Sequence, residues 1–138
     1  MSNKKKLSYI LGAKIDDISL EQALEKTREF LVSSIKYSAN TAEKQVSSIK
    51  YIVTPNPEIC LQAKKNQRYQ NILNNAFLSL PDGFGLKIGA RVLGQRLQNR
   101  VTGVDFTLEL MKLAAEKNWR VFLFGGEERI AQRCQKVL

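Results

Sequence analysis

Histidine is absent from the 138 residues of the sequence, and cysteine occurs only twice, at Cys60 and Cys134. Without histidine, the chain has no imidazole base for catalysis and no imidazole ligand for zinc. The two cysteines form no CxxC pair, which excludes a metal knuckle and is typical of isolated thiols in a reducing compartment. The sequence therefore predicts a cytoplasmic protein without a metal site.

Long apolar runs and acidic residues are also scarce. The apolar stretch at residues 7–13 ends at Lys14, far short of the roughly 20 residues of a spanning helix and at the lower limit for a secretory signal. Only 13 Asp and Glu face 22 Lys and Arg, for a net charge of +9. This excess favours anionic partners, namely phosphates, nucleic acid or an acidic lipid surface. The cations are scattered, with no nucleic-acid motif, which argues against nucleic acid.

Short apolar segments alternate with amphipathic helical patterns along the chain. The strands are expected at 7–15, 51–53, 76–80 and 119–124, and the helices at 19–32, from 57, at 67–75, 84–94 and 104–117, and from 127. A capping box at Ser19 and Gln22 and the Asn56–Pro57 pair begin two of these helices. Strands separated by helices imply parallel pairing. The sequence thus predicts one α/β domain over residues 1–138, a Rossmann-like parallel sheet flanked by helices.

Two of the predicted helices carry apolar residues aligned on one face. The aligned residues are Phe84, Ile88 and Val92 in the first and Val104, Leu108, Met111 and Ala115 in the second. The final helical pattern reaches Leu138 without a Gly, Asn or Pro stop signal. We therefore expect the sheet to be incomplete at the C-terminus, with an exposed apolar patch at 119–124 that favours self-association and weakens catalysis.

One hexapeptide, VSSIKY, occurs twice, at residues 32–37 and again at 46–51. The offset of 14 residues indicates a local tandem duplication, too short to be a solenoid repeat. We expect the segment 32–51 to form an exposed loop or a frayed helix extension, with no function of its own.

Ligands of parallel α/β sheets bind beyond the carboxyl ends of the strands. Asp82 lies there, between stiff Pro81 and permissive Gly83, where a partly desolvated carboxylate makes a good base near neutral pH. The alternative is a turn residue that caps the next helix. Gly125 and Gly126 follow the last strand as a fragment of a phosphate-binding turn, although they form no GxGxxG motif.

Three more polar residues are candidates for substrate binding, each with a structural alternative. Thr54 and Asn56 follow the strand at 51–53 and could hold sugar hydroxyls, or simply end the strand and cap the next helix. Arg100, with backbone N–H groups of residues 103–105, could bind a phosphate. Otherwise Arg100 is a solvated cation and Thr102 a helix cap.

Four motifs in order, TPNPEI, LPDGFG, NRVTGVD and VFLFGG, resemble the WecG/TagA/CpsF family, glycosyltransferase family 26. The opening LGAKIDDISLEQAL also looks like that family's first strand and helix. The resemblance covers nearly the whole chain apart from the duplicated insert. It implies an inverting, metal-independent transferase that needs no cofactor.

The resemblance also implies substrates and roles. An N-acetylmannosamine-type sugar passes from a UDP donor to N-acetylglucosamine on undecaprenyl diphosphate, for teichoic acid or another surface polysaccharide, at the inner face of the cell membrane. By the same resemblance Asp82 is the general base, Thr54 and Asn56 lie near the reacting sugars, and Arg100 contacts a diphosphate. Gly83, Gly125 and Gly126 complete the candidate site, and a homo-oligomer is possible.

Family members continue past the GG turn, with further donor-binding residues and a C-terminal appendage that contacts the membrane. A catalytically inactive fragment of the family is therefore one alternative to the transferase. Two others are a nucleotide-binding oxidoreductase module, argued from the GG turn, and a basic nucleic-acid-binding protein, argued from the net charge. The oxidoreductase is disfavoured because the GG turn follows a late strand and lacks a third glycine.

Overall fold

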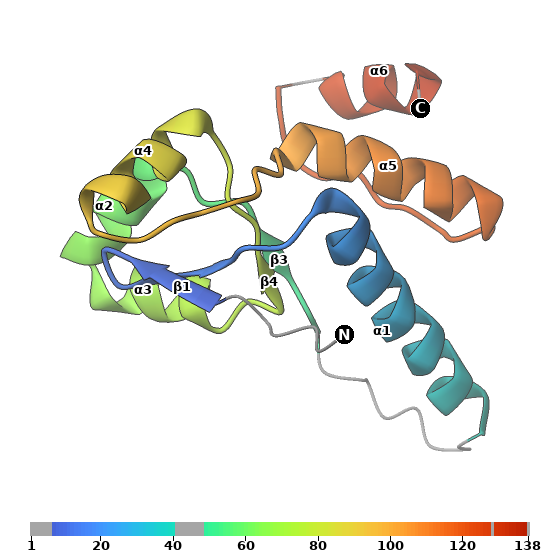
Figure 1. Cartoon of the computed structure of the whole chain (residues 1–138). Coiled ribbons are helices and arrows are strands. Elements are labelled where there is room, and N and C mark those ends of the chain that lie inside the picture. Colours follow the sequence, from blue (N-terminus) through green and yellow to red (C-terminus); the bar gives the residue numbers. More distant parts are fainter. Residues whose placement is uncertain (1–6, 41–48, 128, 138) are drawn as a thin grey trace. The chain divides into compact units, whose positions relative to one another are not determined.

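A computed structural model describes residues 7–40, 49–127 and 129–137 (Figure 1). The chain divides into an N-terminal unit, Met1–Phe106, and a C-terminal unit, Thr107–Leu138. The first unit contains β1 (Leu7–Ile10), β2 (Ala13–Asp16), α1 (Leu20–Asn40), β3 (Ile52–Val53), α2 (Pro57–Lys65), α3 (Gln67–Asn74), β4 (Leu78–Ser79) and α4 (Phe84–Val92). The helix α5 (Gly103–Glu116) begins in the first unit and continues into the second, which also contains α6 (Ile130–Val137). The protein is thus a mixed α/β structure.

The first described segment is a tight antiparallel hairpin of β1 and β2. The two turn residues, Leu11 and Gly12, both have positive φ, 52° and 86°, as the type I′ turn requires. The φ of Gly12 favours glycine, and a Cβ there would also require the end of the Gln70 side chain to shift. The segment 7–15, expected as one short strand or as half of a hairpin, is therefore a complete hairpin of two strands and a turn.

The helix α1 begins at the predicted capping box. The Ser19 N–H donates to Gln22 Oε1 at 3.0 Å, and the Gln22 N–H donates to Ser19 Oγ at 3.3 Å. The helix continues to Asn40, well past residue 32. Of the two alternatives for this segment, residues 32–40 therefore adopt the helix extension and not the loop, and they contain no Pro or Gly that would interrupt the helix. Residues 41–48 of the duplicated segment lie outside the described residues.

The strands β3 and β4 pair in parallel, as expected from their separation by helices. Backbone bonds extend the pairing at both ends, from Phe77 N to Tyr51 O (2.9 Å) and from Asp82 N to Pro55 O (3.1 Å). Within the described ranges this sheet has two strands, so the wider Rossmann-like sheet is not seen. The Ser79 N–H, at the other edge of β4, donates to the Asp16 carboxylate at 2.9 Å and not to a third strand.

Residues 119–124, expected as a strand with an exposed apolar patch, form no strand in the structure. Their exposure is as expected, since Phe122 and Phe124 are 86% and 94% exposed. A strand exists only through hydrogen bonds to a neighbour, and among the described residues no extended segment pairs with this one. The helix that follows begins at Ile130, later than the expected residue 127.

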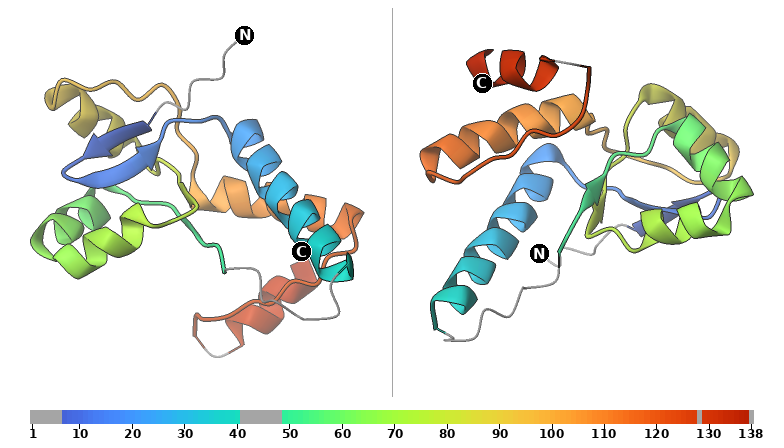
Figure 2. Two further views of the ribbon diagram at one scale, coloured as in Figure 1. Left: turned by 90° about the horizontal axis from the view of Figure 1, so that it is seen from below. Right: turned by 180° about the vertical axis from the view of Figure 1, so that it is seen from behind.

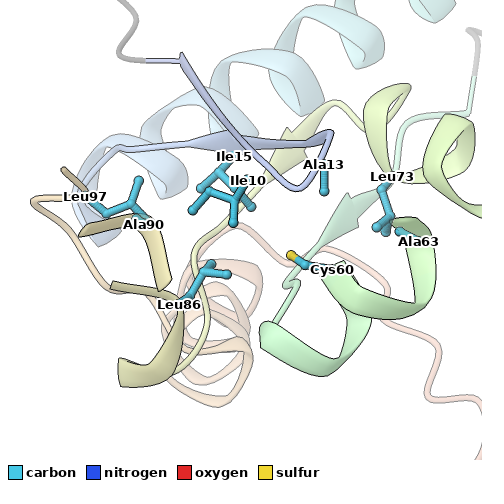
Figure 3. Close-up of a cluster of buried hydrophobic side chains, with 9 residues drawn as sticks. All are labelled: Ile10, Ala13, Ile15, Cys60, Ala63, Leu73, Leu86, Ala90 and Leu97. Atoms are coloured by element: carbon cyan, nitrogen blue, oxygen red, sulfur yellow. The ribbon is translucent and has the colours of Figure 1, made fainter. Parts of the chain in front are cut away.

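The core of the N-terminal unit lies between the hairpin and the helices α2, α3 and α4, which Figures 1 and 2 show gathered on it. Figure 3 shows the side chains that meet there, from these elements and from the loop after α4. They are Ile10, Ala13, Ile15, Cys60, Ala63, Leu73, Leu86, Ala90 and Leu97. One contiguous cluster thus holds the hairpin and three helices together.

The helix α4 packs with a different face from the one that the pattern aligned. Leu86 and Ala90 are buried, whereas Phe84, Ile88 and Val92 are exposed. Small residues set the packing, since a Cβ at Gly85 would lie 3.0 Å from Pro57 Cγ of α2.

The helix α5 departs from the pattern in the same way. Phe106 and Ala114 are its buried residues, and Val104 and Leu108 of the aligned set are exposed. An apolar stripe tells which residues could be buried, but the neighbour that a helix meets decides which of them are.

Candidate active site

The parallel pair brings two segments of the chain to the same edge of the sheet. Because the Asp82 N–H donates to Pro55 O, the turn after β4 lies beside the turn after β3. This edge is formed by the carboxyl ends of both strands, where ligands of such sheets bind. Thr54, Asn56 and Asp82 are therefore neighbours, as the sequence predicted.

The carboxylate of Asp82 meets the beginning of α5. Its Oδ2 accepts a hydrogen bond from the Gly103 N–H at 3.3 Å, and the side chain is half-buried. A second bond, from Val101 N to Pro81 O at 3.0 Å, holds the preceding segment along the same turn. Asp82 is thus fixed at the edge of the site by the first residue of α5.

Thr54 approaches the same point from β3. A Cβ placed on Gly103 would lie 3.0 Å from Thr54 Oγ1. A larger residue at 103 would push the threonine or the helix away, so the glycine permits this close approach. The hydroxyl of Thr54 and the carboxylate of Asp82 therefore both lie next to the first residue of α5.

Asn56 caps the helix α2. Its Oδ1 accepts a hydrogen bond from the Ile59 N–H at 2.9 Å, and Pro57 takes the first helical position. The predicted cap is confirmed. A contact with sugar, which would use the amide nitrogen, stays a prediction.

Gly83 supplies both a sharp bend and open space. Its φ of 84° and ψ of 146° belong to a region that residues with side chains rarely enter. A Cβ at this position would meet nothing within 4 Å. The chain therefore turns away directly after Asp82 and leaves room there for a substrate.

The N–H groups of residues 103–105 are less available for phosphate than the sequence suggested. The Gly103 N–H already donates to Asp82, and the Asp105 N–H donates to Thr102 Oγ1 at 3.1 Å. Thr102 is therefore the helix cap. Arg100 is exposed, and its backbone lies next to the Pro81 turn because Val101 bonds there.

The two remaining candidates, Gly125 and Gly126, belong to the C-terminal unit. Both have positive φ, 102° and 83°, as expected of a turn that needs glycine. Their part in binding stays a prediction.

The buried carboxylate of Asp17, which the sequence analysis did not identify, holds the loop that leads to the site. Asp17 accepts hydrogen bonds from the Asn99 N–H at 2.8 Å, the Asn99 Nδ2 at 2.9 Å and the Gln98 N–H at 3.0 Å. These bonds anchor the loop that leads to Arg100 and Gly103. The signal in the sequence is the pair Asp16–Asp17 directly after an apolar strand, since buried carboxylates require such partners.

The described ranges contain no group of three or more Cys, Asp and Glu residues arranged to hold a metal ion. They also contain no helix whose length and apolar character would let it cross a bilayer.

Comparison with known proteins identifies relatives that share one name. The sequence is 39% identical to an N-acetylglucosaminyldiphosphoundecaprenol N-acetyl-beta-D-mannosaminyltransferase of Bacillus spizizenii over 88 residues, 63% of this chain and 34% of the relative. It is 29% identical to the enzyme of the same name from Staphylococcus aureus over 137 residues, 99% of this chain and 49% of the relative. The match thus spans about half the length of the Staphylococcus aureus relative and about a third of the Bacillus spizizenii relative.

The family comparison covers nearly the whole chain. The model of the glycosyl transferase WecG/TagA/CpsF family matches residues 8–138, a range that includes every candidate residue of the site. The chain therefore belongs to the WecG/TagA/CpsF family of glycosyl transferases.

Proposed function

We propose that the chain serves an inverting transfer of an N-acetylmannosamine-type sugar from a UDP donor to N-acetylglucosamine linked to undecaprenyl diphosphate. The names of the relatives state the acceptor and the sugar. The observation that carries the proposal is the position of Asp82, held by Gly103 beside Thr54 at the carboxyl edge of the parallel strands. One fixed carboxylate next to open space suits a reaction that needs a single base.

In the proposed reaction, Asp82 takes the proton from the attacking hydroxyl of the acceptor sugar. The hydroxyl oxygen forms a bond to the anomeric carbon of the donor, while the bond from that carbon to the UDP oxygen breaks. The electron pair and the negative charge leave on UDP, and the proton stays on Asp82 until water removes it. Attack opposite to the leaving group inverts the anomeric centre.

The other candidates bind and orient the substrates in this proposal. Thr54 and Asn56 contact the sugars near Asp82. Arg100 pairs with a diphosphate, which a guanidinium can bind through two parallel hydrogen bonds. Gly125 and Gly126 let the backbone approach the donor phosphates.

We further propose the wider setting. Both units belong to one α/β domain whose parallel strands are part of a Rossmann-like sheet. The protein works at the inner face of the cell membrane, where a lipid-linked acceptor is presented. It self-associates through the exposed apolar residues at 119–124.

The test compares Asp82→Asn with Asp105→Asn in a version of the chain extended to the length of its relatives, because residues 1–138 alone are expected to be a weak catalyst. The assay measures UDP release from UDP-N-acetylmannosamine with a soluble lipid-diphosphate analogue as acceptor. Asp82→Asn should lower turnover at least ~100-fold, since the amide cannot take the proton. Asp105 lies on α5 and accepts a hydrogen bond from the Thr102 hydroxyl, so Asp105→Asn should change turnover little. Equal turnover of Asp82→Asn and the unmutated chain would contradict the role of Asp82.

Binding of the donor gives a second readout that does not need turnover. Arg100→Ala should weaken binding of UDP-sugar or of lipid diphosphate by about 1–3 kcal/mol, the range of a charge-assisted hydrogen bond. Unchanged affinity for both would leave Arg100 as a solvated cation.

A further inference from the structure

The exposed face of α4 combines apolar and cationic side chains. Phe84, Ile88 and Val92, spaced four residues apart, lie on one side of the helix. They are 65%, 53% and 81% exposed, although buried Leu86 and Ala90 hold the opposite side in the core. Large apolar residues that stay exposed as a contiguous stripe mark a surface that meets an apolar partner.

Cations accompany this stripe without any acidic residue. Lys87 and Arg91 lie on α4 itself, and Arg96 and Arg100 follow it. Between Asp82 and Asp105 the sequence contains no Asp or Glu. Arg91 and Arg96 are exposed, while Lys87 donates to Gln98 O at 2.9 Å. The partner that fits is apolar inside and anionic at its surface.

We infer that α4 lies in the interface of an anionic phospholipid bilayer, with Phe84, Ile88 and Val92 among the acyl chains and Arg91 and Arg96 among the phosphates. An amphipathic helix with basic flanks binds lipid in this manner, through apolar burial together with attraction to anionic headgroups. The inference deepens the proposed function and rests on it only for the view that the acceptor is a lipid.

The position of the helix in the chain gives the surface its consequence. Phe84 is separated from Asp82 by Gly83 alone, and no atom lies within 4 Å of the place that a Cβ of Gly83 would occupy. A bilayer that holds α4 therefore brings its headgroup layer to the base. A diphosphate attached to a membrane lipid would reach Asp82 without leaving the membrane surface.

The first experiment measures vesicle binding by residues 1–138 without sugar nucleotide or acceptor. The vesicles contain either phosphatidylcholine alone or equal parts of phosphatidylglycerol and phosphatidylcholine. Binding should be stronger to the anionic vesicles and should fall about fivefold for each of Arg91→Gln and Arg96→Gln. Ile88→Asp should weaken it at least about tenfold, since a carboxylate replaces an apolar contact and repels the headgroups.

The matched control is Ile72→Asp on α3. Ile72 is an isoleucine of nearly the same exposure, 47% against 53% for Ile88, on a different helix. Its variant should bind vesicles like the unmutated chain. Circular dichroism verifies that both variants remain folded. Equal losses in the two variants, or equal binding to neutral and anionic vesicles, would overturn the inference.

A fluorescence experiment locates the contact directly. Trp119 is the single tryptophan, so Trp119→Phe provides a silent background for Phe84→Trp and, as control, Ile72→Trp. Acyl chains carrying bromine should quench tryptophan at position 84 and leave position 72 unaffected. If light scattering instead shows dimers that Ile88→Asp separates, and position 84 escapes quenching, the face joins two copies of the chain and the inference is wrong.

None of these measurements depends on sugar transfer. Vesicle binding through α4 with no effect of Asp82→Asn would leave the inference intact and contradict the proposed function. Loss of turnover in Asp82→Asn without vesicle binding through α4 would support Asp82 as the base and contradict the inference about the membrane.

Discussion

The two units of the chain treat their apolar residues in opposite ways. In the N-terminal unit, side chains from a hairpin and three helices form one buried cluster. In the C-terminal unit, α6 has no buried residue, and Phe122 and Phe124 face solvent. Both units show helical periodicity and apolar runs in the sequence. The difference teaches that a pattern supplies apolar surface, while burial requires a partner for it.

Side-chain hydrogen bonds hold distant segments of the N-terminal unit together, since Asp17 accepts from Gln98 and Asn99. In the C-terminal unit, Lys112 donates to Glu109, which lies one turn away on the same helix. The first kind of bond positions the loop beside the candidate site, and the second supports a single exposed helix.

The largest expected effect is on the free energy of unfolding when one apolar side chain is truncated in each unit. Ile15→Ala removes a fully buried side chain from the core of the N-terminal unit. It should lower the free energy of unfolding by about 2–5 kcal/mol, because a cavity adds to the lost burial. Phe122→Ala removes a larger but exposed ring and, at protein concentrations low enough to keep the chain monomeric, should change it by no more than about 0.5 kcal/mol. Urea denaturation of both variants measures the difference.

A reversed order would break the comparison. If Phe122→Ala destabilised the chain more than Ile15→Ala, the aromatic ring would be buried in solution by self-association. Repetition of the denaturation at several protein concentrations tests this, since the stability of an oligomer depends on concentration.

A smaller effect is expected when the buried and exposed carboxylates are compared. Asp17→Asn removes the charge that accepts three hydrogen bonds and should cost about 1–3 kcal/mol of stability. Glu109→Gln breaks the exposed pair with Lys112, 2.6 Å apart, and should cost less than about 1 kcal/mol. Thermal unfolding at equal salt measures both. Equal shifts would show that the loop at 98–99 does not depend on Asp17.

Local chemistry predicted much of the fold. The box of Ser19 with Gln22, the cap at Asn56 and the parallel pairing of β3 with β4 follow from neighbouring residues or from strands separated by helices. The same reasoning brought Thr54, Asn56 and Asp82 to one edge, because parallel strands end together. These features needed no knowledge of the tertiary contacts.

Other features depend on contacts that sequence spacing does not contain. The alignment of Phe84, Ile88 and Val92 could not tell that the smaller face of α4, with Gly85 against Pro57, would pack instead. The carboxylates of Asp16 and Asp17 find partners more than 60 residues away along the chain. Residues 119–124 carry a strand composition, but a strand also requires a neighbour with free backbone groups.

The smallest expected effect on stability at neutral pH concerns the two thiols, whose reactivity compares the buried core of the N-terminal unit with the exposed helix α6. Burial raises the pKa of Cys60 from 9.0 to about 11, whereas Cys134 is exposed on α6. Since the thiolate is the nucleophile, an alkylating reagent at pH 8 should modify Cys134 quickly and Cys60 only when the core opens. The raised pKa also means that the fold favours the neutral thiol of Cys60. Its contribution to stability is complete below pH 9 and is lost as the pH rises toward about 11.

Two variants separate this contribution from the other groups that titrate in alkali. Cys60→Ala should flatten the fall in unfolding free energy between pH 9 and pH 11 relative to the unmutated chain, and Cys134→Ala should leave that fall unchanged. Mass spectrometry after brief alkylation assigns the reactive thiol. Rapid modification of Cys60 in the native chain would mean that the core between the hairpin and α2 opens readily. The contrast between a packed N-terminal unit and an exposed C-terminal unit would then not hold in solution.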